Sequence, residues 1–427
     1  GPLRFSRSVI APPGASRMRQ ARVSMGAGRL GGRVSREGAA ARGMLTRLRA
    51  AAPPAPNPLG RESPLAGPGP VLGRKVNFSA GPACLYEDVL LQAQAEMLSF
   101  GGTSGLGVME MSHRGKLFVG IRDKAESDLR QLLGLSDDFA VLFLQGGAST
   151  QFAALAANLA SQGQAADYLV SGSWSKKAFA EGTKVGLDAR VCATGDNKSV
   201  PAFDTWQLSD PSQAAFTHMC TNETIQGVEV PWAVVGQYLS SDHGKQVPLV
   251  ADMSSHFLSK PIDRVNEYGV IYAGAQKNLG PAGVTIVIVK KELMGKAQPG
   301  TPTMFDWQTM ADNDSLYNTP PCWPIYMCGL VFKKLIDLGG LEEVEKINKA
   351  KCSLIYDAIA SSAGFYSCPV DPAVRSAMNV PFTIPAGGDL EKAFVAEAEA
   401  EGLINLKGHR SVGGMRASIY NAMPIEG

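Results

Sequence analysis

Apolar residues recur along the chain at two spacings, and the longer spacing predicts helices. In "KLFVGIRDKAESDLRQLLGL" the apolar side chains fall three to four positions apart, which is typical of an amphipathic helix, and Gly134 is expected to end it. The face that we expect to be buried consists of Leu117, Ile121, Ala125, Leu129 and Leu132/Leu133. The segment "GGASTQFAALAANLA" is also expected to be helical, after a glycine-rich turn.

Short runs of uninterrupted apolar residues predict strands. They are "AVLFL" (Ala140–Leu144), "DYLV", "AAFTHMC", "VPLVAD", "GVIYA" and "GVTIVIV", with helical or loop segments between them. Continuous apolarity is typical of strands covered on both faces, so the pattern predicts a mainly parallel sheet between helices. After about Pro324 long helical patterns, "NVPFTI", a helix around Leu390–Glu401 and "MRASIY" predict a smaller α+β unit.

The first 74 residues differ in charge from the rest of the chain. They hold 13 arginines, no lysine and two acids, a net charge of +11, whereas the remainder has 28 basic and 37 acidic residues, a net charge of −9. An Arg-rich, acid-poor segment with repeated Ala, Gly and Ser is typical of an organelle transit peptide, and Ala51–Pro70 has the composition of an unstructured linker. A merely disordered basic extension is the alternative. The acidic body argues against nucleic-acid binding.

Two further classes of protein are disfavoured by composition. No apolar run reaches the roughly 20 residues that a membrane span needs, so we expect no membrane segment. The seven cysteines are an odd number without a C-x-x-C pair, which argues against a disulfide framework and against a zinc site. We therefore expect no metal.

Two charged residues follow predicted strands. Asp252 ends "VPLVAD", and Lys277 follows "GVIYA" 25 residues later. A desolvated lysine is a nucleophile for carbonyl carbons, and a pyridoxal phosphate (PLP) enzyme combines such a lysine with an acid beside the pyridine nitrogen. Taken alone, Asp252 is better explained as the cap of a following turn, and a solvated surface position is the commoner fate of a lysine.

Three other positions could contact a cofactor. The turn in "FLQGGASTQF" offers free N–H groups to an anion near Ser149, although an ordinary strand-to-helix connection explains it equally well. Trp174 could stack on a planar ring or simply pack in the core. Thr224, in "CTNETIQG", could reach a phenolic oxygen or close a turn.

Two His-Arg pairs could bind a substrate with two anionic ends. They are His113-Arg114 and His409-Arg410, and the second pair is followed by Arg416. Arginine binds carboxylates and phosphates through two parallel hydrogen bonds. Exposed surface charge is the alternative, but the glycines around both pairs favour close backbone packing.

Five segments, in this order, resemble one enzyme family. They are "NFSAGPA", "VMEMSHRG", "GVIYAGAQKNLGPAGVTIVIV", "YNTPP" and "LKGHRSVGGMRASIYNAMP", and they are similar to segments of the phosphoserine aminotransferases, which are class-V, PLP-dependent transaminases. The resemblance spans nearly all of Lys75–Gly427. It implies the α/β aspartate-aminotransferase-like fold (fold type I), with a mainly parallel seven-stranded sheet in a large domain and a smaller α+β C-terminal domain.

The expected domain division follows from that resemblance and from composition. Residues 1–74 would be a transit peptide and linker, and 75–325 the large PLP-binding domain, whose N-terminal segment contributes to the small domain. Residues 326–427 would be the small domain, truncated at its end. The resemblance to plant and algal members favours the plastid as destination, with the mitochondrion as the alternative.

The resemblance also assigns roles to residues. Lys277 resembles the catalytic Schiff-base lysine and Asp252 the partner of the pyridine nitrogen, while Trp174 matches the stacking residue and Thr224 the ligand of the phenolic oxygen. The positions that match phosphate ligands are Ala148, Ser149 and Gln276, joined by Asn318 and Thr319 from the other subunit of a homodimer with composite sites. The expected substrate-binding residues are Arg416 for the α-carboxylate and His113, Arg114, His409 and Arg410 for the second anionic group. Ser149-Thr150 stands where some bacterial members have Gly-Arg.

The implied reaction is a ping-pong transamination. L-Glutamate would give its amino group to 3-phosphohydroxypyruvate, which forms O-phospho-L-serine and 2-oxoglutarate in the phosphorylated pathway of L-serine biosynthesis. The family resemblance also suggests formation of 4-phosphohydroxy-L-threonine. The rivals are a cysteine desulfurase, for which no cysteine has a recognisable setting, and a catalytically silent binding protein.

Overall fold

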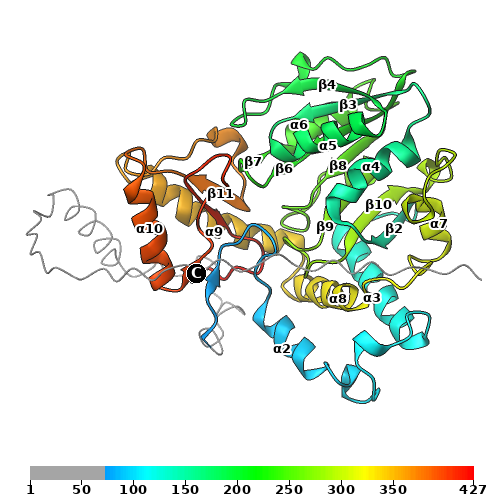
Figure 1. Ribbon diagram of the computed structural model, residues 1–427, viewed down its shortest axis with the longest axis horizontal. Helices are drawn as coiled ribbons and strands as arrows, with labels where there is room; N and C mark the ends of the chain where they lie inside the picture. Colours follow the sequence, from blue (N-terminus) through cyan, green and yellow to red (C-terminus); the bar gives the residue numbers. More distant parts are fainter. Residues whose placement is uncertain (1–72) are drawn as a thin grey trace, which may run out of the picture. The chain divides into compact units, whose positions relative to one another are not determined.

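The centre of the molecule is a seven-stranded sheet. The computed structural model describes residues 73–427, and the predicted transit peptide lies outside them except for its last two residues. The strand order is β2-β10-β9-β8-β5-β3-β4 (Figure 1), and only β10 runs antiparallel to its neighbours. The mainly parallel seven-stranded sheet is therefore confirmed. The strands are β2 (Phe139–Leu144), β3 (Ala165–Val170), β4 (Asp188–Thr194), β5 (Ala214–Cys220), β8 (Leu249–Asp252), β9 (Val270–Gly274) and β10 (Thr285–Lys290).

Residues of the sheet strands enter two different cores. In β2, Val141 and Phe143 belong to one core, which also contains side chains of α3 and α8, while Leu142 and Leu144 belong to a second core with side chains of α4. Because both faces of the strand are covered, neither set of positions is polar. This arrangement explains the continuous apolar runs of the sequence.

The helices follow the predicted alternation with strands. Within residues 73–427 no helix is both long and apolar enough to cross a membrane. The helices are α2 (Glu87–Ala95), α3 (Lys116–Leu133), α4 (Gly147–Leu159), α5 (Ser173–Lys184), α6 (Trp232–Ser240), α7 (Trp307–Asp312), α8 (Cys322–Asp337), α9 (Leu341–Ala360) and α10 (Asp389–Ala400).

Helix α3 corrects one detail of its predicted face. It ends as expected at Gly134, whose φ of 60° is a left-handed conformation that glycine adopts readily. The buried stripe is centred on Phe118, Ile121 and Ala125, whereas Leu117 is 44% exposed, so its predicted burial was wrong. Leu117 lies one turn before Ile121 but at the edge of the buried stripe, next to the solvent-facing side of the helix.

Strand β4 is the strand that the apolar runs did not predict. It pairs with β3 alone, and most of its residues are exposed or half-buried. β2 is also an edge strand, but its residues are mostly buried, whereas those of β4 mostly face solvent, so the sequence of β4 does not need to be uniformly apolar.

A third core belongs to the C-terminal part of the chain. The strands β11 (Asn379–Phe382) and β13 (Met415–Ser418) pair antiparallel, and β1 (Val76–Asn77) pairs parallel with β12 (Leu403–Ile404). Phe78 packs in this core with residues of β11 and β13. The division at residue 325 stays a prediction; α8 shares its core with α3 and the sheet.

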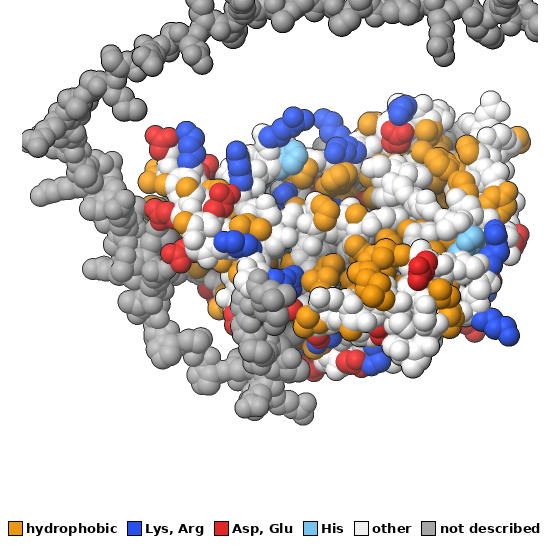
Figure 2. Space-filling view, turned by 60° about the horizontal axis from the view of Figure 1, so that its bottom comes forward, with side chains coloured by type: hydrophobic (Ala, Val, Ile, Leu, Met, Phe, Trp, Pro, Cys, Tyr) orange, Lys and Arg blue, Asp and Glu red, His pale blue; other side chains and the backbone are white. Residues whose placement is uncertain are grey.

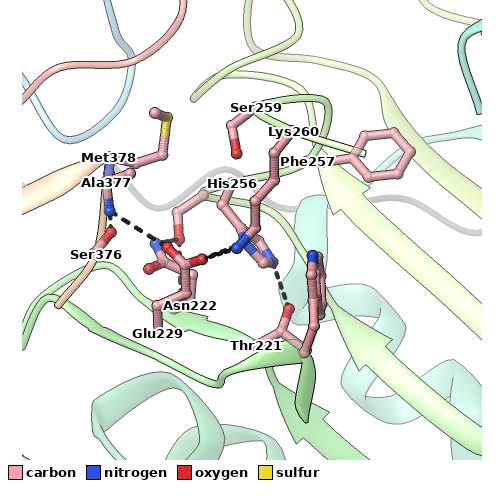
Figure 3. Close-up of polar contacts among 12 residues, drawn as sticks. Thr221, Asn222, Glu229, His256, Phe257, Ser259, Lys260, Ser376, Ala377 and Met378 are labelled. Carbon is pink, nitrogen blue, oxygen red and sulfur yellow. Dashed lines mark hydrogen bonds and ion pairs between the residues drawn. The ribbon is translucent and has the colours of Figure 1, made fainter. Parts of the chain in front are cut away.

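A hairpin connects the sheet with this C-terminal part. It is formed by β6 (Asn222–Glu223) and β7 (Val228–Glu229). At its base Thr221 Oγ1 lies 2.7 Å from His256 Nε2, and Glu229 forms an ion pair with Lys260 and accepts a hydrogen bond from the Ala377 amide at 3.4 Å (Figure 3). Burial alone would raise the pKa of Glu229, but the His256 ring and the Lys260 ammonium hold that pKa at about 2. These contacts fix the base of the hairpin, and Thr224 lies in its turn.

Candidate active site

Lys277 lies in the turn between β9 and β10, at the position that the sequence predicted. Its Nζ donates a hydrogen bond to Thr224 Oγ1 at 2.7 Å and lies 5.0 Å from the centre of the Trp174 ring. Burial lowers the pKa of the Lys277 ammonium, and the Asp252 carboxylate opposes part of that shift. The amine is thus easier to deprotonate than that of an ordinary lysine, as a nucleophile or base requires.

Asp252 ends β8 and is 4% exposed. Its Oδ1 accepts hydrogen bonds from the Ser254 amide at 2.9 Å and the Ser254 hydroxyl at 2.6 Å, so the alternative prediction of a turn cap is confirmed. Within the described residues no hydrogen bond involves Oδ2. One oxygen therefore fixes the side chain, and the other can accept a proton donor such as a pyridinium N–H.

Arg416 brings the C-terminal part of the chain to the same place. It stands on β13, and its Nη1 donates to the Thr224 carbonyl at 3.2 Å. Its Nε is buried and makes no hydrogen bond with any of residues 73–427. Burial lowers the pKa of this guanidinium, which indicates that its charge is poorly solvated. A carboxylate ligand would satisfy both the charge and the free N–H.

His409 and Arg410 lie in the loop before β13. His409 Nδ1 accepts a hydrogen bond from the Ser411 amide at 3.2 Å, which leaves Nε2 as the donor of the neutral ring. Burial first, and then the charges of Arg416, Arg410 and Lys177, lower the pKa of His409. Lys177 Nζ lies 4.1 Å from the centre of the Trp174 ring. These side chains form a cationic rim that favours anions.

The predicted phosphate site is the start of α4. Gly146, with φ 93°, precedes the helix, and no side chain caps it. Ala148 and Ser149 are in the first turn, so their N–H groups have no helical partner and suit an anion. The Thr150 hydroxyl instead donates to the Gly146 carbonyl at 3.0 Å. Gln276 directly precedes Lys277, and its carbonyl accepts from the Ala83 amide at 2.9 Å.

The remaining predicted residues form a second cluster. Thr319 Oγ1 lies 3.3 Å from His113 Nδ1, and Arg114 Nη2 donates to the Tyr317 carbonyl at 2.9 Å. Asn318 and Thr319 are exposed. Burial, and then the charge of Arg114, lower the pKa of His113. No hydrogen bond or ion pair within the described residues joins this cluster to Lys277.

The residues around Lys277 fit PLP. They supply an amine of lowered pKa, a tryptophan ring beside it, a buried carboxylate with a free oxygen and an uncapped helix start for a phosphate. The unpartnered Arg416 Nε adds a place for the substrate. Each of these features suits a different part of the cofactor or of the substrate.

Three contacts of the site were not expected from the sequence. A Cβ atom on Gly81 would lie 3.2 Å from Lys277 Cγ, so the segment "SAGPA" closes over the lysine. Lys177 joins the cationic rim, and Glu223 holds the start of α5. Each lies near a residue or segment that the sequence analysis singled out: Gly81 is part of "NFSAGPA", Lys177 follows Trp174 by three residues, and Glu223 directly precedes Thr224.

Comparison with known proteins shows the class of protein to which this chain belongs. Residues 75–427 match the family model for class-V aminotransferases. Phosphoserine aminotransferase 2, chloroplastic, of Arabidopsis thaliana is 55% identical over 357 residues, which cover 83% of this chain and 82% of the relative. The chain belongs to the phosphoserine aminotransferase family within that class.

Solved structures of the same family share the fold. Phosphoserine aminotransferase from Bacillus circulans subsp. alkalophilus is 46% identical with a TM-score of 0.77, and the match covers 83% of this chain and 95% of that one. The PLP-bound phosphoserine aminotransferase from Trichomonas vaginalis is 39% identical with a TM-score of 0.76, and the match covers 83% and 97% of the two chains. The expected fold type I is therefore confirmed.

Proposed function

We propose that this chain is a PLP-dependent transaminase that transfers the amino group of L-glutamate to 3-phosphohydroxypyruvate. The products are 2-oxoglutarate and O-phospho-L-serine, as in the phosphorylated pathway of L-serine biosynthesis. The observation that carries the proposal is Lys277 Nζ, which is held by Thr224 at 2.7 Å, lies beside the Trp174 ring and faces the charge of Asp252.

The residues of the site divide the work between binding and proton transfer. When bound, PLP supplies an electrophilic carbon and a ring that accepts electrons from the substrate's Cα–H bond. Lys277 Nζ then removes the Cα proton of glutamate, and the same nitrogen returns a proton to Cα in the second half-reaction. With the cofactor bound, Asp252 Oδ2 would accept a hydrogen bond from the pyridinium N–H, and the Trp174 ring would restrict the planar cofactor ring. Thr224 would release the Lys277 amine and form a hydrogen bond with the phenolic oxygen of the cofactor.

Both substrates carry two anionic ends, and the basic side chains can bind them. Arg416 binds the α-carboxylate, because its guanidinium is fixed at Nη1 and free at Nε. His409 and Arg410 bind the second anion, which is a carboxylate in glutamate and a phosphate in the keto acid. Arginine and histidine donors serve either group, so a single pocket can accept both substrates in turn.

The second cluster supports a homodimer with composite sites. Large apolar side chains are exposed in the segment that leads to His113, with Leu98 84% and Met109 62% exposed. Figure 2 is turned so that the side with α2 comes forward, and it shows apolar side chains gathered on that face. We propose that a second copy of the chain covers this surface and that Asn318 and Thr319 thereby reach the phosphate site of the partner.

A plastid location is proposed from the N-terminal segment and the relatives. The Arabidopsis relative is named chloroplastic, and residues 1–74 have the composition of a transit peptide. A fluorescent fusion to residues 1–74 should enter plastids. Import into mitochondria alone would favour the alternative location.

The function is tested with purified protein. It should be yellow when loaded with PLP, borohydride should add the mass of reduced PLP to the peptide that contains Lys277, and 2-oxoglutarate should appear only when glutamate is added. A colourless protein that PLP does not label, or a labelled protein that forms no O-phospho-L-serine from the two substrates, would contradict the proposal.

A further inference from the structure

Glu223 is a fully buried carboxylate next to the active site, and the reaction described above gives it no role. It is 0% exposed and directly precedes Thr224. Its Oε2 accepts a hydrogen bond from the Trp174 amide at 2.8 Å. Its Oε1 accepts from the Ser175 amide at 2.8 Å and from the Ser175 hydroxyl at 2.6 Å. Both oxygens therefore bind the first turn of α5.

The contact continues into the turn before the helix. Ser175 Oγ accepts hydrogen bonds from the amides of Ser171 and Gly172, both at 3.1 Å, and its own proton has the Glu223 carboxylate at 2.6 Å as the nearer acceptor, with the Gly172 carbonyl at 3.2 Å as the other. Gln226, from the same hairpin, accepts from the Ser173 amide at 3.1 Å. The hairpin thus supplies acceptors for three consecutive N–H groups at the start of α5, which would otherwise have no partner.

Gly172 shows how closely the carboxylate is seated. A Cβ atom on this glycine would lie 2.5 Å from both Cγ and Cδ of Glu223. Its φ of −172° is extended backbone that any residue can adopt, so the backbone itself does not demand glycine. The missing side chain is needed because Glu223 occupies its space.

The two elements that Glu223 joins carry two different contacts of the cofactor site. The hairpin carries Thr224, which binds Lys277 Nζ and, through its carbonyl, Arg416. Helix α5 carries Trp174, whose ring lies 5.0 Å from the same Nζ. Burial raises the pKa of Glu223, and its hydrogen bonds to Ser175 and Trp174 oppose that shift.

We propose that Glu223 is a positioning residue that fixes the Trp174 ring relative to Thr224 and Lys277, and so sets the width of the slot for the planar cofactor. Both of its carboxylate oxygens accept hydrogen bonds from α5, so it acts through the backbone of that helix. The identity of the cofactor rests on the proposed function, but the hydrogen bonds themselves belong to the chain alone.

Glu223→Gln tests the role with the smallest change of shape. The new amide group would place its N–H atoms against a donor of α5, so at least one hydrogen bond is lost. We expect about tenfold weaker PLP binding and about tenfold lower kcat, because a lost hydrogen bond to a charged acceptor has an effect of this order. In the full chain without PLP, the Trp174 and Ser175 amides should exchange their hydrogen faster than in the wild type.

Two further variants separate position from charge. Glu223→Asp keeps the charge but shortens the side chain, and Gly172→Ala pushes the carboxylate away without changing it. Both should change PLP affinity and amide exchange in the same direction as Glu223→Gln. If Glu223→Asp and Gly172→Ala behave like the wild type, the charge and not the position matters, and the proposal is wrong.

Asp306→Asn is the matched control. Asp306 caps α7 by accepting from the Gln308 amide at 3.0 Å and the Thr309 hydroxyl at 2.6 Å. Its loss should lower thermal stability and leave PLP affinity and kcat unchanged. If Glu223→Gln does no more than that, Glu223 is only a helix cap and the proposal fails.

A substitute variant is available if Glu223→Gln is unstable, and the two proposals fail by different outcomes. If Glu223→Gln does not fold, Ser175→Ala removes one of the three donors and is judged by the same measurements. Failure of the wild-type chain to transaminate would overturn the proposed function, whereas unchanged amide exchange in the chain without PLP would overturn only the role of Glu223.

Discussion

The residues around Lys277 are braced inside one chain, whereas those around His113 lie at its surface. Lys277, Thr224 and Arg416 come from three distant segments and are joined by hydrogen bonds of 2.7 and 3.2 Å. Around His113 the contact with Thr319 is longer, at 3.3 Å, and Asn318 and Thr319 are exposed. One chain thus preorganises the first cluster for chemistry. The second cluster would be completed only by the partner subunit of the proposed homodimer.

The two clusters also differ in how far their charged groups are exposed to solvent. Lys277 and Arg416 are charged groups whose burial lowers their pKa values. A poorly solvated cation binds an anion more strongly than an exposed one does. We therefore expect substitutions in the first cluster to have larger effects than substitutions in the second.

Lys277→Ala is the most severe way to break the buried cluster. We expect kcat to fall by at least about 10³-fold, because the variant loses both the nucleophile and the proton carrier. The assay is formation of O-phospho-L-serine from glutamate and 3-phosphohydroxypyruvate. Lys245→Ala, at an exposed lysine, is the control and should turn over normally. A normal rate for Lys277→Ala would show that the mechanism is wrong.

Arg416→Lys tests whether geometry matters in the buried cluster as well as charge. Lysine keeps the charge but cannot bind a carboxylate through two parallel hydrogen bonds, so kcat/KM for glutamate should fall roughly 10²-fold. The matched control is Arg375→Lys, at an arginine that packs 5.0 Å over the Tyr356 ring. It should change stability rather than kcat/KM. Equal effects of the two variants would remove Arg416 from the substrate site.

Mixing two variants, each damaged in one of the two clusters, would sharpen the account of the second cluster. Lys277→Ala chains are unfolded and refolded together with chains that carry Asn318→Ala and Thr319→Ala. If sites are composite, half of the dimers are mixed and each has one intact site, so about a quarter of wild-type activity should return. Activity that stays at the sum of the two separate preparations would assign both clusters to a single chain.

Substitution of His409 should have the smallest effect of the four, and it should remove a pH dependence of anion binding. Its pKa is lowered in the free protein, so the ring is neutral at pH 7 and above, and a bound anion favours its protonated form. Binding therefore takes up a proton and should strengthen as pH falls from 8 to 6, by about threefold. Glutarate, a dicarboxylate without an amine, is the probe. His409→Gln should lose this dependence, and an unchanged pH profile in that variant would exclude His409 as its source.

The sequence predicted six of the seven strands of the sheet because a buried strand depends on local pattern. Continuous apolar runs identified the buried strands, and Asp252 and Lys277 follow from their places at the ends of β8 and β9. The edge strand β4 and the exposed Leu117 were missed because a pattern does not show where cover by neighbouring elements ends.

The bracing of the site could not be predicted in the same way. Glu223 and the Trp174 amide are 49 positions apart, and Arg416 and the Thr224 carbonyl are 192 positions apart. No local spacing predicts such pairs. Thr224 and Arg416 were candidates from the residues themselves, but their definite roles came from the family resemblance, and Glu223 had no proposed role at all.

The sequence by itself determined which segments can be buried strands and helices, and which few residues have the chemistry of a transaminase. Only the tertiary structure decided that Thr224 holds Lys277, that Glu223 joins the hairpin to α5, and that Asp252 keeps one oxygen free. The physical reason is that periodicity and side-chain chemistry are local properties, while burial, pKa and hydrogen-bond partners arise when distant segments exclude water from one another.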